Sequence, residues 1–233
     1  MTHVTDHGGL WAMAHLGTPM AIRVAATLRI ADQLAAGPRS APELAPVVDA
    51  DADALDRLLR FLSRRGVLCE HPPGRYALAP LGEPLRDDHP AGMRAALDIE
   101  GAGRPELAFV QLLHSVRTGE AGYPVQFGRG FWDDLAAEPG RATAFNAVMG
   151  SDVPDRAPAI VAGYDWGTLG RVVDVGGGNG SLLTALLTAY PALRGTVVDA
   201  PAGVAAATAA LAAAGLADRA TAVRLHRLLI EQF

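Results

Sequence analysis

The stretch RVVDVGGGNGSLLTALLTAYPALRGTVVDAP, residues 171–201, decides the fold class of this chain. It opens with Val172, Val173 and Val175, a β-branched run typical of a buried parallel strand. A glycine-rich turn, GGGNG at 176–180, follows the run directly. A strand followed by a glycine turn is the usual beginning of a βαβ unit.

The rest of this stretch completes the unit. Leucines recur through residues 181–190 at helical spacing, and Pro191 ends the predicted helix. A second strand is predicted over residues 195–198, with Asp199 directly after it. Because a helix joins the two strands, they should lie parallel in one sheet. The region therefore predicts an α/β, Rossmann-like fold.

The residues of the turn suggest chemical roles. Glycine takes positive φ angles and has no Cβ to hold a ligand away from the backbone. Amides at the start of the following helix carry partial positive charge, which suits an anionic group such as a carboxylate. Asp199 stands where an acid at the end of a second strand accepts the hydroxyls of a ribose. Asp174, at the end of the first strand, is placed to face an ammonium group.

Two nucleoside ligands compete for such a turn. A dinucleotide site requires G-x-G-x-x-G, and none of the glycines at 176–178 begins that pattern. The spacing is instead acid-x-G-x-G-x-G, which resembles the S-adenosylmethionine motif of Rossmann-like methyltransferases. Its members are Asp174, Gly176, Gly178 and Gly180. Another nucleotide, or a turn that only shapes the junction of strand and helix, stays an alternative at this point.

The first third of the chain predicts a winged helix. Ser40 and Glu43 form a capping box at the start of a short helix, and a Pro-Pro-Gly turn joins two extended runs further on. The expected elements are helices over residues 10–34, 42–47 and 53–65 and a hairpin formed by residues 67–70 and 75–78. Residues 90–165 predict further helices, broken by glycine and proline.

The third helix of the winged helix permits two interpretations. It carries four arginines, as a DNA-reading helix would: Arg57, Arg60, Arg64 and Arg65. Four carboxylates lie in or just before its first turn: Asp49, Asp51, Asp53 and Asp56. A helix that reads phosphates would not place so many carboxylates at its entrance, so we favour a structural or dimer-forming role.

Composition narrows the class of protein. Half of the 233 residues are hydrophobic and 19% are charged, as in a globular protein, and the net charge of −5 argues against general nucleic-acid binding. The single cysteine, Cys69, excludes an internal disulfide and a cysteine-based zinc cluster, and we expect it to be buried. No signal peptide or membrane span is predicted, so we expect a cytoplasmic protein without a membrane partner.

Four motifs resemble one known family. DVGGGNG at 174–180, VVDAP at 197–201, FNAVM at 145–149 and GYDW at 163–166 are similar to motifs of the bacterial and plant O-methyltransferases that modify phenols. The polyketide and anthracycline tailoring enzymes of secondary metabolism are close in style. The resemblance covers roughly residues 10 to 223 and includes the winged-helix front, which in that family forms an intertwined homodimer.

The resemblance implies an architecture in three parts. A mainly α, winged-helix dimerisation domain is expected over residues 1–95, and a helical linker and acceptor-pocket region over 96–165. A partial α/β Rossmann-like S-adenosylmethionine-binding domain is expected over 166–233. The family also implies a small aromatic acceptor.

Individual residues follow from the same resemblance. Asp174, Gly176, Gly178 and Gly180 match the donor turn, and Asp199 matches the acid that holds the ribose of S-adenosylmethionine. The residues expected to line the acceptor pocket are Asn146, Met149, Phe131 and Trp132. No motif identifies the acceptor itself or the position that is methylated.

The sequence departs from the family after Val223. It ends VRLHRLLIEQF, whereas the family continues with further strands and the histidine that acts as general base. His226 does not match the motif that holds that histidine, so we assign no catalytic residue. The Rossmann-like domain is expected to be incomplete, with β-branched residues of the first strand half exposed at an open edge.

We therefore expect an S-adenosylmethionine-dependent O-methyltransferase of a small phenolic or polyketide natural product, carried by a C-terminally truncated chain. A fragment or frame-shifted product is the favoured explanation of the truncation. The alternatives are a non-catalytic donor-binding or dimerising relative, a member diverted to other chemistry, and a winged-helix regulator.

Overall fold

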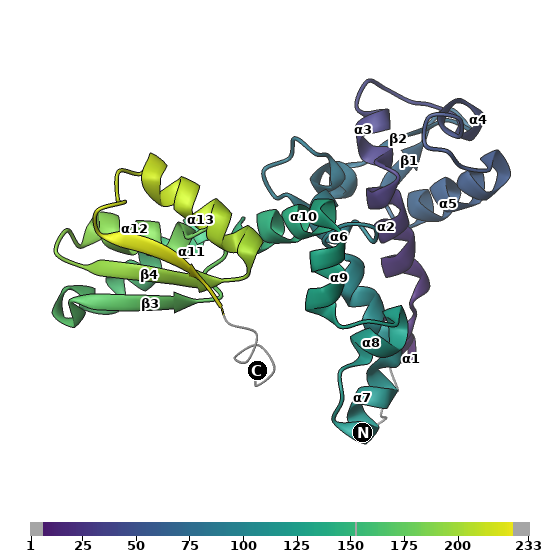
Figure 1. Ribbon diagram of the computed structural model, residues 1–233. Helices are drawn as coiled ribbons and strands as arrows, with labels where there is room; N and C mark the ends of the chain where they lie inside the picture. The colour runs from purple at the N-terminus through teal and green to yellow at the C-terminus, as the bar shows by residue number, and fades with distance from the viewer. Residues whose placement is uncertain (1–6, 152, 226–233) are drawn as a thin grey trace, which may run out of the picture. The chain divides into compact units, whose positions relative to one another are not determined.

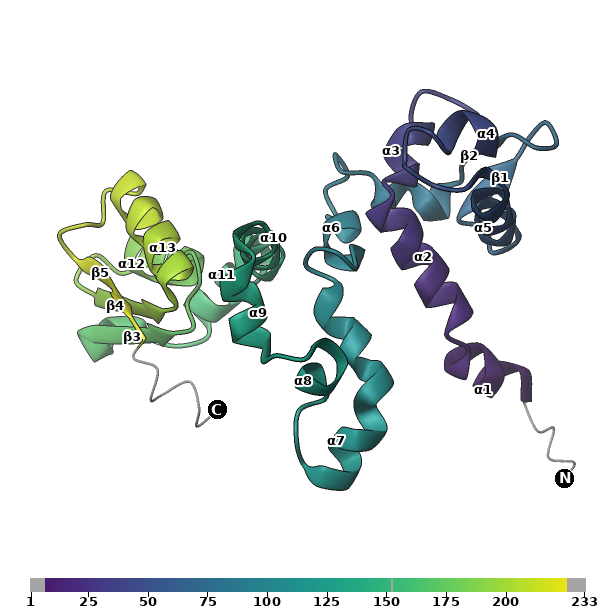
Figure 2. The same cartoon turned by 45° about the vertical axis from the view of Figure 1, so that its right-hand side comes forward.

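A computed structural model describes residues 7–151 and 153–225 of the chain. The chain forms two compact units, Met1–Phe131 and Trp132–Phe233. Mainly helical elements make up the first unit, and a parallel sheet with helices makes up the second (Figures 1 and 2). The predicted combination of a helical front and an α/β Rossmann-like region is confirmed.

The first unit follows the winged-helix order that the sequence predicts. Its α-helices are α1 (His7–Ala14), α2 (Gly17–Thr27), α3 (Ile30–Leu34), α4 (Ala41–Leu44), α5 (Ala52–Arg64), α6 (Met93–Leu97), α7 (Leu112–Thr118) and α8 (Gly122–Phe127). Strands β1 (Leu68–Glu70) and β2 (Tyr76–Leu78) and the 3-10 helices η1 (Pro80–Leu85) and η2 (Arg104–Gln111) complete it. The strands pair antiparallel as the predicted hairpin, with Leu68 opposite Leu78.

The single helix predicted over residues 10–34 is wrong, because the structure divides it into α1, α2 and α3. Pro19 stands in the first turn of α2, where its ring would clash with the carbonyl of residue 15 if the helix ran on. Arg29 adopts a left-handed conformation, with φ of 55°, between α2 and α3. Apolar periodicity continues across both breaks, so the pattern alone did not indicate them.

The core of the first unit is formed by the buried faces of α2, α3 and α5 and by the hairpin. Its fully buried large side chains are Ile30, Leu44, Leu59, Leu62 and Tyr76. The predicted capping box is present at α4, where the Glu43 carboxylate accepts hydrogen bonds from the backbone N–H of Ser40 at 2.6 Å and from its hydroxyl at 2.7 Å. Local capping and core packing together fix this helix.

Cys69 is exposed, so the expectation that it would be buried is wrong. Successive side chains of a strand point to opposite faces. On β1, Leu68 takes the buried position and Cys69 the outward one. The register of this short strand, which composition does not reveal, decides the exposure of the thiol.

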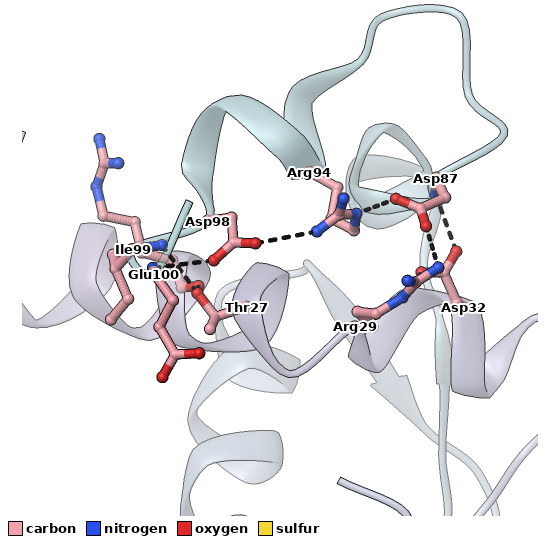
Figure 3. Close-up of polar contacts among 9 residues, drawn as sticks. Thr27, Arg29, Asp32, Asp87, Arg94, Asp98, Ile99 and Glu100 are labelled. Atoms are coloured by element: carbon pink, nitrogen blue, oxygen red, sulfur yellow. Dashed lines mark hydrogen bonds and ion pairs between the residues drawn. The ribbon is translucent and has the colours of Figure 1, made fainter. Parts of the chain in front are cut away.

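A chain of alternating charges joins the α2–α3 junction to the segment that leads into α6 (Figure 3). Arg29 and Arg94 both form ion pairs with Asp87, and the backbone N–H of Asp87 donates to Asp32 Oδ1 at 2.9 Å. At the other end, the N–H of Ile99 donates to the hydroxyl of Thr27 at 3.0 Å. These contacts hold the segment after η1 against α2, and the left-handed Arg29 belongs to them.

The second unit contains the predicted βαβ stretch. Its elements are α9 (Phe131–Ala137), which begins at the last residue of the first unit, α10 (Pro139–Gly150), α11 (Val153–Ala162), the 3-10 helix η3 (Trp166–Leu169), β3 (Arg171–Val175), α12 (Ser181–Ala189), β4 (Arg194–Asp199), α13 (Pro201–Ala213) and β5 (Ala220–Arg224). The three strands are parallel in the order β3-β4-β5 (Figures 1 and 2). Val173 pairs with Thr196, and Val197 with Ala222.

Helices α12 and α13 cover one face of this sheet. Fully or nearly fully buried residues from them and from β4 form its core: Leu183, Leu187, Val197, Ala207 and Leu211. On the opposite face, Val173 is 59% exposed and Val175 is 64% exposed. Val172, which was also expected to be half exposed, packs against the covered core instead, and among the described residues no strand pairs with the outer edge of β3.

A buried ion pair links α9 to α10. Asp134 is 4% exposed and its carboxylate lies 2.8 Å from Nη1 of Arg141. A buried carboxylate requires such a partner, and loss of either member would leave a buried charge.

None of the described helices has the length and hydrophobicity needed to cross a bilayer.

Candidate functional site

The glycine turn between β3 and α12 requires glycine at three positions. Gly176 and Gly180 have φ of 75° and Gly178 has φ of 55°, in the left-handed region that residues with a Cβ rarely adopt. The N–H of Gly176 donates to the carbonyl of Val198 at 2.8 Å, which ties the start of the turn to the end of β4. The turn therefore lies at the carboxyl end of two adjacent parallel strands, where open α/β sheets bind ligands.

Asp199 reaches from the end of β4 to this turn. Its Oδ2 accepts a hydrogen bond of 2.7 Å from the N–H of Gly178, and its Oδ1 accepts one of 2.6 Å from the N–H of Ala200. The side chain is partly buried. The structure thus brings Asp199 and the three glycines together, as the spacing predicted.

Asp174 lies under the same turn. Its Oδ2 is buried and has no hydrogen-bond partner in the described part of the chain. Burial and, second, the negative charge of Asp199 raise the pKa of the Asp174 carboxyl above its ordinary value of 3.8. A carboxylate held in this way favours a positively charged group as its partner.

Two further glycines make room for these carboxylates, which the sequence reasoning missed. A Cβ at Gly177 would lie 2.5 Å from Asp174 Oδ2, and a Cβ at Gly203 would lie 2.4 Å from Asp199 Oδ1. Neither distance is compatible with a side chain. Gly177 belongs to the GGGNG run, which the sequence makes easy to notice. The contact of Gly203 with Asp199 depends on how α13 packs, so no sequence pattern indicates it.

Asn179 is a further residue to which the sequence pattern assigned no role. Its Oδ1 accepts hydrogen bonds from the hydroxyl of Ser181 at 2.6 Å and from the N–H of Ser181 at 3.1 Å. The second of these bonds satisfies one of the amides at the start of α12. An asparagine whose side chain accepts from the N–H two residues on forms an Asx turn, a local pattern typical of asparagine before a helix.

The residues predicted to line an acceptor pocket come from α9 and α10. Asn146 is partly buried and Met149 is 56% exposed, both on α10, while Trp132 on α9 is 56% exposed. Phe131 packs edge-on against Tyr123 with ring centroids 5.3 Å apart, within the first unit. Phe131 and Tyr123 are among the residues of the first unit that line a cavity of about 310 Å³.

The second unit has an apolar cavity of about 340 Å³ between α11 and α12. It is lined by Val153, Pro154, Ala157, Pro158, Val161, Ser181 and Ala185. Ser181 places it next to the glycine turn, but neither aspartate of the site lines it. The polar site and this cavity are therefore distinct features of the unit.

The polar site combines two opposite kinds of recognition. The partial positive charge at the start of α12 suits an anionic group, while Asp174 suits a cation. Asp199 offers acceptor oxygens to hydroxyl groups at the neighbouring strand. An amino acid joined to a ribose, with a carboxylate, an ammonium and two hydroxyls, matches this set of groups.

Two known protein families match two separate parts of the chain. Residues 109–225 match the O-methyltransferase domain family, and residues 12–86 match the O-methyltransferase dimerisation domain family. The first match contains the glycine turn and Asp199, and the second contains the winged helix.

Individual relatives are similar over most of the chain. A 2,7-dihydroxy-5-methyl-1-naphthoate 7-O-methyltransferase of Streptomyces carzinostaticus is 50% identical over 218 residues, which are 93% of this chain and 66% of that protein. The aclacinomycin 10-hydroxylase of Streptomyces purpurascens is 44% identical over 212 residues, 90% of this chain and 57% of that protein. This chain thus spans less than two thirds of either curated relative.

A solved structure is similar over most of the chain. It is an O-methyltransferase from neocarzinostatin biosynthesis in complex with S-adenosylmethionine and 2-hydroxy-5-methyl naphthoic acid. The TM-score is 0.88 at 49% sequence identity, and the alignment covers 94% of this chain and 68% of that one. Its bound molecules are a sulfonium amino-acid nucleoside and an aromatic acid.

Proposed function

The chain belongs to the O-methyltransferase family of secondary metabolism, and on that premise we propose that it binds S-adenosylmethionine at the glycine turn and serves the O-methylation of a small aromatic natural product. The observation that carries the proposal is the convergence of Asp174, Asp199 and three left-handed glycines on one turn. Family membership and local chemistry support the same ligand.

The residues of the turn fit the groups of this donor. The Oδ2 atom of Asp174 is buried and has no hydrogen-bond partner among the described residues, so it suits the ammonium group. The positive end of α12 suits the carboxylate, and the Asp199 oxygens suit the ribose hydroxyls. When bound, S-adenosylmethionine supplies a methyl group activated on a sulfonium.

This chain contributes binding and alignment to the reaction. Asp174, Asp199 and the turn hold the donor, and a fixed donor raises the rate of an in-line displacement by proximity and orientation. A phenol with an ordinary pKa near 10 also needs a base at its hydroxyl. We assign no such base to this chain, and His226 lies outside the described residues.

The acceptor class is proposed from the relatives. The naphthoate and naphthoic acid in their names are fused aromatic rings that carry oxygen substituents. Asn146 and Met149 on α10, with Phe131 and Trp132 at the start of α9, remain our proposed contacts to such a ring. The amide of Asn146 would hydrogen-bond oxygen substituents, and the other three would contact the ring plane.

We also propose that the partner of the chain is a second copy of itself. Residues 12–86 match the dimerisation domain, and large apolar side chains along α1 and before α2 are 66–86% exposed: Leu10, Trp11, Met13 and Leu16. An exposed apolar stripe of this kind usually marks a protein interface. Light scattering of the purified chain tests this point. We expect the wild type to have the mass of a dimer and the double variant Trp11→Glu/Met13→Lys to have half that mass.

The decisive test of donor binding is calorimetric titration of the purified chain with S-adenosylmethionine and with S-adenosylhomocysteine. We expect saturable one-site binding of both and a rise in melting temperature with ligand concentration. A folded chain that binds neither would contradict the proposal. Adenosine, which lacks the amino-acid part of the donor, is the control and should bind more weakly.

A second candidate is donor binding without methyl transfer. A relative that is named for hydroxylation and shares 44% identity favours it. Incubation with radiolabelled S-adenosylmethionine and a hydroxynaphthoate separates the two: binding without label transfer would support this candidate, and label in the acceptor would support methyl transfer.

A further inference from the structure

The last turn of α10 lies against the glycine turn. A Cβ built on Gly150 would lie 3.2 Å from Nδ2 of Asn179 and 3.7 Å from its Cγ and Oδ1. The first distance is shorter than ordinary van der Waals contact between carbon and nitrogen. Gly150 therefore allows helix and turn to approach more closely than any other residue would.

Asn179 has little freedom to move away from such a Cβ. Its Oδ1 accepts two hydrogen bonds from Ser181, of 2.6 Å and 3.1 Å, and these bonds fix the amide plane. It also stands between Gly178, whose N–H donates to Asp199, and Gly180, which leads into α12. A displaced Asn179 would shift the amides that face the donor or break the bonds at the start of α12.

We propose that Gly150 is a positioning residue of the donor site, which sets how closely α10 packs on the turn and keeps Asn179 hydrogen-bonded to Ser181. The inference rests on the donor-binding function proposed above and identifies a residue outside the donor motif that controls it. Helix α10 also carries Asn146 and Met149, so the same contact links the proposed acceptor-facing helix to the donor turn.

The backbone of α10 allows a clean test. Gly150 has no positive φ, so alanine is compatible with its conformation and should favour the helix. Gly140 lies in the first turn of the same helix, and a Cβ there would meet no atom within 4 Å. Gly140→Ala is therefore a matched control that adds the same methyl group in open space.

The experiment is a double-mutant cycle read by calorimetric titration with S-adenosylhomocysteine. We expect Gly150→Ala to raise the dissociation constant by about fivefold, the effect of losing one neutral hydrogen bond, and Gly140→Ala to leave it unchanged. Asn179→Ser withdraws the amide from position 150 and keeps an oxygen acceptor. In that background, Gly150→Ala should cost less than about twofold.

The outcomes separate this inference from the proposed function. Equal affinity of wild type and Gly150→Ala, or an equal loss with and without Asn179→Ser, would overturn the positioning role while donor binding stands. A folded wild type that does not bind S-adenosylhomocysteine would overturn both. If Gly150→Ala loses its cooperative melting transition, the rescue is read there instead: recovery in the double variant supports the contact, and no recovery refutes it.

Discussion

Asp199 at the end of β4 accepts a 2.7 Å hydrogen bond from the N–H of Gly178, so the acid of one strand is anchored to the glycine turn that follows its neighbour. This bond fixes where the second acceptor oxygen and the turn amides lie relative to each other. It is the geometric basis for treating the two sequence motifs as one site.

Replacing Asp199 by alanine should weaken donor binding. The variant loses the acceptor proposed for the ribose hydroxyls, and charge-assisted hydrogen bonds of this kind correspond to a loss of about 10- to 100-fold in affinity. Calorimetric titration with S-adenosylhomocysteine measures the change. Asp218→Ala, which removes an exposed carboxylate of the same unit, is the control and should bind as the wild type does.

Donor binding should depend on the protonation of Asp174. Burial and the charge of Asp199 raise its pKa above 3.8, so in a pH window just above 3.8 this carboxyl is still protonated although an ordinary aspartate is already ionised. The charged form binds the ammonium, and donor affinity should therefore rise as pH increases through this window. Titrations over this pH range, on wild type and Asp174→Asn, measure it; the variant should bind weakly with a flatter profile.

The free energy of unfolding of the ligand-free chain should fall over the same pH window in which donor affinity rises. A carboxyl whose pKa is higher in the folded state binds more protons when folded than when unfolded. The free energy of unfolding is therefore lowered as pH rises through the raised pKa of Asp174, and Asp174→Asn should remove this decline. Denaturant melts at several pH values check the sign, and a decline that persists in the variant would contradict the assignment.

Gly180→Ala should destabilise the second unit by more than Gly215→Ala. Both glycines have positive φ, of 75° and 70°, which costs alanine about 1–2 kcal/mol. Only at Gly180 would the new Cβ also meet a neighbour, at 3.3 Å from Ala207 Cβ on α13. Chemical denaturation of the two variants measures the difference, and equal losses would show that the close approach to α13 is not costly.

The two faces of the sheet should respond differently to truncation. Leu183 on α12 is fully buried against the covered face, and Leu183→Ala should cost about 2–5 kcal/mol. Val175 is 64% exposed on the open face, and Val175→Ala should change stability by less than about 0.5 kcal/mol. The same denaturation assay reports both, and a large loss at Val175 would mean that this face is covered in solution.

Acid should weaken the first unit through Glu43. Hydrogen bonds from the Ser40 backbone and hydroxyl lower its pKa from 4.5 to about 2. Because the folded pKa is depressed, the contribution of Glu43 is fully present above 4.5 and is lost as pH falls toward 2. Thermal melts of wild type and Glu43→Gln between these values should converge at the acid end.

Local signals explain which elements could be predicted from the sequence. The βαβ unit, the capping box and the hairpin depend on glycines, caps and turns within a few residues, and the structure confirms each of them. The helix over 10–34 failed because periodicity does not register a left-handed residue such as Arg29. The three-part division of the chain stays a prediction, as do the roles of individual site residues.

The site itself was predictable only in part. Asp174, Asp199 and the glycines form a motif because their spacing along two strands is fixed by the strand and helix lengths. The contacts of Gly150 and Gly203 depend on how α10 and α13 pack, which is a tertiary property. The raised pKa of Asp174 depends likewise on burial that no sequence window reveals.

The outward position of Cys69 on β1 has a practical consequence. It is the chain's sole cysteine, so maleimide chemistry would attach a fluorophore or spin label at one defined place without any substitution. Mixing donor- and acceptor-labelled samples would then report subunit exchange directly by energy transfer. The wing hairpin thus provides a built-in probe for following assembly in real time.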